Sequence, residues 1–499
     1  MPDVDPEFLD LPYRRLGEAA LTRARQLGAT YADFRFERRR KQNIRVRDRS
    51  LERLTDSQTV GYAVRVVHGG AWGFASAVQL TPDAAAATAE AAVSVAVTLA
   101  PLNSEPVELA PEPAYRGTWV SSYDIDPFAV PDNDKVTFLT SINERMLRTG
   151  KVAHVDFAVG QVLENKYFAD LAGSDLVQQR VRVDGDFTAA RVDDASGAFD
   201  AMRSCSLPSG RGWEHIATAY SYGAEADEVP DLLEEKMASP SVEPGHYDLV
   251  IHPTNLWLTI HESIGHATEL DRVLGYEANY AGTSFATLDN LGTLRYGSPV
   301  MHVTGDRSME HGLSTVAWDD EGVAAQQWDL IRDGVLVGYQ LNRQMAHKQG
   351  FGRSNGCAYA DSPGAVPIQR MPNVSLQPAA TDVTVEDLIG GVERGIYVVG
   401  DRSWSIDMQR HNFQFTAQRF YEIRGGRLGG QLKDVAYQGT TTEFWNSMEA
   451  VGGPSTWVLG GSFNCGKGQP GQAAPVSHGC PAALFRQVNV LNTASEASE

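Results

Sequence analysis

Cysteine is scarce in this sequence. The 499 residues contain four, namely Cys205, Cys357, Cys465 and Cys480, and none of them belongs to a C-x-x-C pair. So few and so widely spaced cysteines argue against a disulfide framework. They suit a reducing compartment, so we expect a cytoplasmic protein whose thiols are free to bind metal.

Positive charge and long apolar segments are also in short supply. The chain carries 43 basic and 63 acidic residues, a formal net charge of −20. We therefore expect neither nucleic acid nor a membrane surface as a partner, because both are bound through cationic patches. Residues 1–7 are acidic rather than apolar, which argues against a signal peptide. No uninterrupted apolar run approaches the roughly 20 residues of a membrane span.

Nucleotide-binding signatures are missing from the first half of the chain, which contains neither G-x-G-x-x-G nor a P-loop sequence. Residues 13–27 show the period of an amphipathic helix, whereas residues 32–37 and 44–47 alternate and are expected to form two strands. The locally basic residues 35–41 are interpreted as a solvated face of a strand rather than a nucleic-acid patch. The first half of the chain therefore mixes helices with antiparallel strands.

A change of character near residues 228–245, which are polar, acidic and proline-bearing, indicates a domain boundary. Beyond it, Gly, Val, Tyr and Thr recur at short intervals, as in a barrel or two stacked sheets. We predict an α+β protein with two domains. Residues 1–240 form a mixed helix and antiparallel-sheet domain, and residues 241–499 form a largely β domain, barrel-like or two-sheeted, that carries one metal-binding helix.

That helix contains His261, Glu262 and His266, two imidazoles and a carboxylate within six residues. Neutral imidazole is a good zinc ligand, and a carboxylate beside a metal-activated water is a good general base. The spacing of the two histidines is i, i+5, which leaves their rings roughly 140° apart on a regular helix, against about 40° for i, i+4. We therefore predict a π-bulge that restores the alignment, eased by Gly265.

A third candidate ligand is Cys465, which lies in the glycine-rich residues 460–470 and is expected in a flexible loop. A thiolate is a strong zinc ligand, and two histidines with one cysteine leave the fourth tetrahedral position for water. Cys480 and His478 are rival candidates for this role and rank below Cys465, because they lie beyond the Gly-Lys-Gly turn. A catalytic zinc site also needs an oxyanion stabiliser, which no motif in the sequence names.

The His-Glu-x-x-x-His motif, followed near the end of the chain by the Cys-Gly-Lys glycine loop, resembles the TldD half of the TldD/PmbA family of metallopeptidases. The resemblance extends over nearly the whole chain and is strongest from about residue 244. It implies one zinc ion per chain, held by His261, His266 and Cys465, with Glu262 as the catalytic base. It also implies that the segment from residue 350 to Asn373 lies near the active cleft.

What the resemblance implies about function is a cytoplasmic protease paired with a PmbA-like (TldE) subunit that lacks the metal motif. The pair would enclose the site, so that unfolded peptides alone enter; a homodimer is the alternative assembly. The strand-rich second half further suggests that an extended peptide binds by adding a strand to a sheet edge. Two other functions stay open, a non-catalytic scaffold subunit and a zinc hydrolase of small non-peptide amides.

Overall fold

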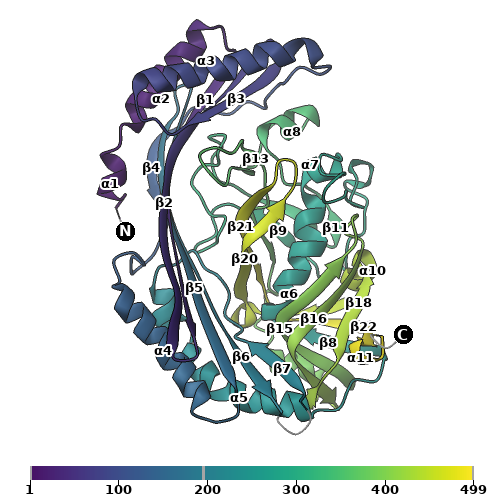
Figure 1. Cartoon of the computed structure of the whole chain (residues 1–499). Coiled ribbons are helices and arrows are strands. Elements are labelled where there is room, and N and C mark those ends of the chain that lie inside the picture. The colour runs from purple at the N-terminus through teal and green to yellow at the C-terminus, as the bar shows by residue number, and fades with distance from the viewer. Residues whose placement is uncertain (1–2, 194–196, 497–499) are drawn as a thin grey trace.

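A long, largely antiparallel sheet forms the N-terminal half of this computed structural model, which describes residues 3–193 and 197–496. The strand order is β3-β2-β1-β5-β6-β4, with β7 paired to β6. The strands are β1 (Tyr31–Arg47), β2 (Ser50–His68), β3 (Ala71–Ala77), β4 (Arg116–Val120), β5 (His154–Asp170), β6 (Asp175–Val192) and β7 (Phe199–Arg203). This sheet curves around the C-terminal half of the chain (Figure 1).

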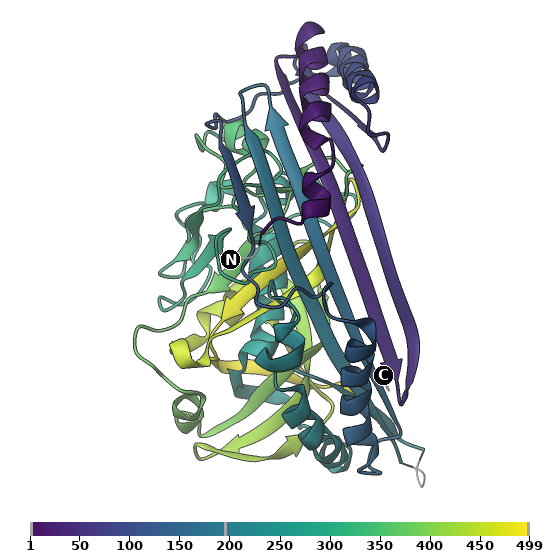
Figure 2. The ribbon, with the colours of Figure 1, turned by 90° about the vertical axis from the view of Figure 1, so that its left-hand side faces the viewer.

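Two groups of helices cover opposite ends of the long strands (Figure 2). The helices are α1 (Pro6–Leu9), α2 (Tyr13–Gln26), α3 (Pro82–Leu99), α4 (Asp132–Leu147) and α5 (Tyr222–Ala238). Side chains of α2 and α3 share one core with apolar side chains of β1 and β2, and those of α4 and α5 share a second with β5 and β6. The amphipathic period of residues 13–27 is thus confirmed as α2, whose apolar stripe packs on the sheet.

The segment Pro82–Leu102, α3 with the turn after it, is long and apolar enough to cross a membrane by length and composition alone, which is weak evidence; 33% of that window is buried in the structure. Its alanine side is a packing surface, because a Cβ at Gly73 of β3 would lie 1.9 Å from the carbonyl oxygen of Ala92. Elsewhere on this helix Val95, Val97 and Leu99 are 41%, 49% and 43% exposed. The helix therefore packs one face on the sheet and leaves several apolar side chains partly exposed.

Most of the basic run in β1 is buried, although Lys41 at its end is exposed, so its interpretation as a solvated face was wrong. Arg35, Glu37 and Arg39 are 2%, 0% and 8% exposed. They alternate with the apolar side chains that face α2, and they point to the other face of the sheet, where the C-terminal half packs. Arg35, for example, donates to the carbonyl oxygens of Ser362 and Ala365. A second layer on the sheet, which sequence periodicity does not report, also explains why residues 31–47 form one strand instead of two.

Five strands of the C-terminal half close into a barrel, because β15 pairs with β8 on one side and with β16 on the other. These strands are β8 (Gly245–Ile251), β15 (Arg394–Ile406), β16 (Asn412–Arg424), β18 (Val435–Thr440) and β22 (Ala483–Asn492). The strand β17 (Arg427–Leu432) extends the barrel sheet beside β16, and β19 (Met448–Val451) extends it beside β22. The prediction of an α+β protein with a largely β, barrel-like second half is confirmed.

Smaller elements surround the barrel. One sheet contains β9 (Val303–Asp306), β10 (Gln327–Arg332), β11 (Val335–Leu336) and β14 (Asn373–Leu376), a second pairs β12 (Ala358–Tyr359) with β13 (Ile368–Gln369), and a hairpin joins β20 (Val458–Lys467) to β21 (Gln472–Cys480). The helices are α6 (Pro253–Ile260), α7 (Leu270–Val273), α8 (Arg343–Lys348), α9 (Val385–Gly390), α10 (Thr441–Asn446) and α11 (Thr493–Glu496). The chain passes from α5 to β8 through residues 239–244, and a domain boundary at 240/241 stays a prediction.

Candidate metal centre

The histidine motif continues from the end of α6 through a π-helical turn, His261–Gly265, and then a 3-10 turn, His266–Thr268. The predicted π-bulge is therefore confirmed. It brings the two imidazole rings to a centroid separation of 4.7 Å. Gly265 has an ordinary helical φ of −53°, so its role is different from the one expected. A Cβ there would lie 2.6 Å from Sδ of Met371, so glycine is needed for close packing.

Cys465 lies in the strand β20 and is 4% exposed, so the expectation of a flexible loop was wrong. The glycines before it serve close approach instead. A Cβ at Gly460 would lie 2.7 Å from Cγ of Trp257, which belongs to α6. The missing side chain lets the β20–β21 hairpin pack directly on the helix that carries the histidines. This packing brings Cys465 next to His266, although the two residues are 199 positions apart in the sequence.

The three predicted ligands converge. One ligand atom each from His261, His266 and Cys465 lies within 4.8 Å of the others, and all three residues are buried. The Sγ atom of Cys465 is 3.5 Å from Nε2 of His266. A tetrahedral zinc site with Zn–N near 2.05 Å and Zn–S near 2.3 Å requires a separation of about 3.6 Å between nitrogen and sulfur. The donor set and its spacing therefore fit a zinc ion with one open position.

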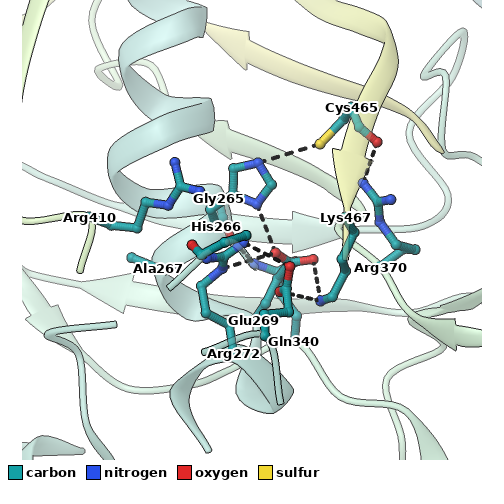
Figure 3. Close-up of polar contacts among 12 residues, drawn as sticks. Gly265, His266, Ala267, Glu269, Arg272, Gln340, Arg370, Arg410, Cys465 and Lys467 are labelled. Atoms are coloured by element: carbon teal, nitrogen blue, oxygen red, sulfur yellow. Dashed lines mark hydrogen bonds and ion pairs between the residues drawn. The ribbon is translucent and has the colours of Figure 1, made fainter. Parts of the chain in front are cut away.

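Hydrogen bonds behind the cluster fix which imidazole nitrogens face it. His478 lies with Nδ1 2.9 Å from the carbonyl oxygen of Val374, which can only accept, so Nδ1 carries the proton and Nε2 is an acceptor. Nε2 of His478 is 2.7 Å from Nδ1 of His261, which must therefore donate. Likewise Nδ1 of His266 donates to Glu269 over 2.8 Å (Figure 3). Both histidines are left with an unprotonated Nε2, the form that binds metal.

Burial favours the same protonation states. It lowers the pKa of His261 and His266, and it lowers the pKa of His478 well below its usual value, so all three imidazoles are neutral near pH 7. Glu269 behaves oppositely. Burial alone would raise the pKa of its carboxyl. The charge of Lys467, 3.0 Å away, and the hydrogen bond from His266 together outweigh burial and hold that pKa well below normal. Glu269 is thus an ionised acceptor that orients His266.

Glu262 follows the first histidine and faces the same cavity, which has a volume of about 430 Å³ and is also lined by His261, His266 and Cys465. Its Oε2 accepts a hydrogen bond from Nη1 of Arg410 over 2.7 Å. A carboxylate in this position, next to the cluster and open to a cavity of ligand size, can exchange protons with a water molecule or a substrate. The arrangement offers three soft or borderline metal ligands and one acid–base group.

The rival ligands lie outside this group. His478 contacts His261 from behind, and Sγ of Cys480 lies 3.7 Å from the carbonyl oxygen of Pro253 at the start of α6. The segment that the resemblance placed near the cleft does reach the cluster, because Arg370 donates to the carbonyl oxygen of Cys465 over 2.7 Å.

Sequence reasoning missed Glu269, Lys467 and Arg410. A signal for Glu269 existed, since an acid three residues after a helical histidine is well placed to orient its ring. Lys467 belongs to the Cys-Gly-Lys motif, but no pattern indicated its contact with Glu269, and nothing comparable marked Arg410, which comes from a distant turn.

A barrel-bearing α+β fold with a buried His–His–Cys group beside a glutamate is the arrangement expected of a metallopeptidase. Residues 244–492 match the family described as PmbA/TldA metallopeptidase C-terminal domain, and residues 32–96 match PmbA/TldA metallopeptidase domain 1. The chain belongs to the PmbA/TldD metallopeptidase family.

Relatives and solved structures match over almost the whole chain. A metalloprotease of Methanothermobacter thermautotrophicus is 27% identical over 93% of this chain and 96% of its own length. A protein named zinc metalloprotease TldD homolog, from Saccharolobus solfataricus, is 20% identical over 94% and 98%. Among crystal structures, TldE of Thermococcus kodakarensis has a TM-score of 0.69 at 16% identity, covering 95% of this chain and 99% of that protein. A Thermotoga maritima protein described as a modulator of a DNA gyrase has a TM-score of 0.75 at 16% identity, over 96% and 100%. At such identities the two structures show the fold alone.

Proposed function

We propose that this protein is a zinc metallopeptidase that hydrolyses unfolded or extended peptides, with one zinc ion per chain, as the catalytic subunit of a TldD/TldE-type complex. The observation that supports this most directly is the convergence of His261, His266 and Cys465 beside Glu262 in one cavity. The name of the Saccharolobus relative, a zinc metalloprotease TldD homolog, agrees with it.

In this proposal each residue has a separate task. His261, His266 and Cys465 hold the ion through two imidazole nitrogens and a thiolate. When bound, zinc supplies Lewis acidity, which makes a water molecule acidic near neutral pH and polarises a carbonyl group. Glu262 accepts the proton of the attacking water and later donates it to the nitrogen of the leaving amine. Glu269 keeps Nε2 of His266 directed at the ion.

Zinc content and peptide cleavage, measured on the same sample, test the proposal. Protein isolated from its own cells should contain one zinc per chain and should cleave casein, which is largely unfolded, much faster than a tightly folded protein. Glu262→Gln should keep zinc and lose turnover, whereas the exposed Glu443→Gln should keep both. Absence of zinc from active protein, or retained activity of Glu262→Gln, would contradict the assignment.

The same experiment separates the two alternatives. A scaffold subunit would contain no zinc and would cleave nothing. A hydrolase of small amides would hold zinc but would act on amino-acid amides and leave casein intact.

An edge for strand addition exists beside the cluster. Within the described residues β20 pairs with β21 alone, so its other edge is unpaired, and residues 461–466 of β20 line the cavity that contains the cluster. We propose that an extended peptide hydrogen-bonds to this edge. N-methylation of alternate backbone amides of a cleaved peptide should then reduce binding at every second position, and an even response along the peptide would count against strand addition.

The partner and the compartment are part of the proposal. The TldE fold of a solved relative and the exposed apolar side chains of α3 support a second, related subunit. Co-purification from native cells should give a heteromer, and a homodimer would require this part of the proposal to be replaced. A cytoplasmic location suits four unpaired cysteines, one of which is a proposed metal ligand.

A further inference from the structure

Hydrolysis of a peptide bond needs a group that stabilises the negative oxygen of the tetrahedral intermediate, and one side chain beside the cluster is suited to this. Among the described residues that line the cavity, two carry a guanidinium group, Arg203 and Arg410. Arg203 is paired at 2.6 Å with Asp401. Arg410 instead reaches Glu262, the residue that follows the first histidine of the cluster. Arg410 is thus the fixed positive charge nearest to the proposed acid–base group.

Arg410 has donors to spare. A guanidinium group offers five N–H donors, and the structure shows one of them, on Nη1, engaged with Glu262 at 2.7 Å. Its Nε is buried without a hydrogen-bond partner. The side chain is 13% exposed, so water satisfies little of it. A buried, incompletely used guanidinium at the edge of a cavity of about 430 Å³ is a binding group for an anionic oxygen.

The backbone that presents Arg410 is held in an unfavourable conformation. Its φ is 63°, in the left-handed region, which is unfavourable for a residue other than glycine. The turn is fixed from inside by Asp407, whose carboxylate accepts from the backbone N–H of Gln409, His411 and Asn412 at 2.8–3.1 Å. Such strain persists where surrounding structure over-determines a residue.

Neighbouring segments fix the same turn from outside. Thr283 donates its backbone N–H to the carbonyl oxygen of Met408 over 2.8 Å, and the Thr441 hydroxyl donates to the carbonyl oxygen of Arg410 over 2.7 Å. The turn is therefore held by one other loop and by the start of α10, which keeps the guanidinium group in place before any substrate arrives. Preorganisation of this kind is what electrostatic stabilisation of an oxyanion requires.

We propose that Arg410 is a catalytic residue that donates a hydrogen bond to the scissile carbonyl oxygen and stabilises the oxyanion formed there. This rests on the proposed peptidase function. As the water oxygen bonds to the carbonyl carbon, the C=O π pair moves onto the carbonyl oxygen and the water proton passes to Glu262. When the oxygen re-forms its double bond, the C–N bond breaks and its electron pair goes to nitrogen, which takes the proton from Glu262. Arg410 keeps its protons throughout.

Arg410 could instead act only by positioning Glu262, and a pair of variants separates the two roles. In Glu262→Gln the ion pair is gone, so a positioning role has nothing left to position. Binding of a phosphinic pseudotetrapeptide built from alanine, whose tetrahedral anion resembles the intermediate, is measured by calorimetry in zinc-loaded Glu262→Gln and in Glu262→Gln/Arg410→Met. Zinc affinity is measured alongside by chelator competition and should be equal in the two.

The oxyanion role predicts about 100-fold weaker phosphinate binding on loss of Arg410, with the corresponding carbonyl peptide affected several-fold at most. Equal phosphinate affinity in the two variants would overturn the proposal. If the wild-type protein binds zinc and phosphinate while the two variants bind phosphinate equally, only the role of Arg410 is refuted. Wild-type protein that binds no zinc refutes the peptidase function itself.

Arg410→Gly provides an independent measurement, because glycine adopts the left-handed conformation freely. The strain relieved at this position offsets part of the stability lost with the ion pair to Glu262, so the variant should stay folded and bind zinc, yet cleave casein about 100-fold more slowly through kcat, with partial recovery on addition of guanidinium ion at low concentration. The matched control is Asp333→Gly, another left-handed position, with φ 51° and a side chain 72% exposed, which should keep full activity. Unchanged activity of Arg410→Gly would refute the proposal.

Discussion

Nδ1 of His261 lies 2.7 Å from Nε2 of His478, and this hydrogen bond joins the π-helical turn after α6 to the strand β21. The carbonyl oxygen of Val374, 2.9 Å from Nδ1 of His478, fixes the proton of His478 on that nitrogen. Nε2 of His478 then accepts from Nδ1 of His261, which leaves the unprotonated Nε2 of His261 facing the cluster. His478 is therefore predicted to tune the metal site without touching the ion. The same strand pair that delivers Cys465 thus also orients one histidine.

Replacing His478 tests this role. His478→Ala should weaken zinc binding about 10- to 100-fold, the usual effect of removing a group that orients a metal-binding histidine. Competition with a zinc-binding dye measures the affinity. His302→Ala, on a half-exposed histidine away from the cluster, is the control. Unchanged zinc affinity in His478→Ala would show that the hydrogen bond to His261 does not matter for the site.

Replacing either of the two cysteines in the β20–β21 hairpin should have very different effects on zinc binding. Cys465→Ser removes one of only three proposed protein ligands and should lose nearly all bound zinc. Cys480→Ser changes an equally buried thiol whose sulfur lies near the carbonyl oxygen of Pro253, and it should retain zinc. Metal analysis after dialysis against a weak chelator compares them. If both variants retain zinc, Cys465 is not a ligand.

The contact between Gly265 and Met371 predicts a coupling of stability. Gly265→Ala would bring a Cβ to 2.6 Å from Sδ of Met371, a side chain that is 1% exposed and has little room to move. Overpacking of this size destabilises by about 1–3 kcal/mol. In Met371→Ala the added methyl group should be tolerated, so the double variant should be more stable than the sum of the single effects. Denaturant unfolding of the four proteins gives the coupling, and strict additivity would argue against the contact.

Protonation of His252 at low pH should destabilise the start of α6. This residue caps the helix by accepting the backbone N–H of Thr254, and burial followed by the charge of Arg419 lowers the pKa of its imidazole to about 4. The unfolded chain has an ordinary histidine pKa near 6.5. Because the folded value is the lower one, this contribution to stability is fully present above pH 6.5 and is lost as the pH falls toward 4.

The variant His252→Asn can still cap the helix but does not titrate in this range. Between pH 7 and 4.5 the wild-type melting temperature should therefore fall further than that of His252→Asn. His246→Asn, on an exposed histidine at the start of β8, should follow the wild type. Equal acid sensitivity of wild type and His252→Asn would exclude His252 as the source.

Chelation provides a further prediction. Removing zinc leaves two neutral imidazoles and a buried thiol together, and binding free energy that is present only in the folded state is lost. The melting temperature should fall with a strong chelator and recover with added zinc, while Cys465→Ser should respond to neither. A wild-type melting temperature that ignores the chelator would argue against a bound metal.

Local sequence patterns predicted the features that depend on residues close together in the chain. The i, i+5 spacing of His261 and His266 required a π-bulge because ring direction on a helix follows directly from residue count. The amphipathic period gave α2 for the same reason. The burial of side chains within strands was harder to predict from the sequence. The charged residues of β1 looked solvated because a second layer over the sheet is not encoded in the two-residue period.

The sequence by itself determined the donor types, since a His-Glu-x-x-x-His helix and a distant cysteine can assemble few other chemistries. Tertiary structure alone decided which groups meet them. Arg410, Lys467 and His478 come from a turn, a strand end and a neighbouring strand that lie 140 to 220 residues away along the chain. Their positions depend on how barrel, hairpin and helix pack, and packing is set by the summed fit of many buried side chains that no short motif contains.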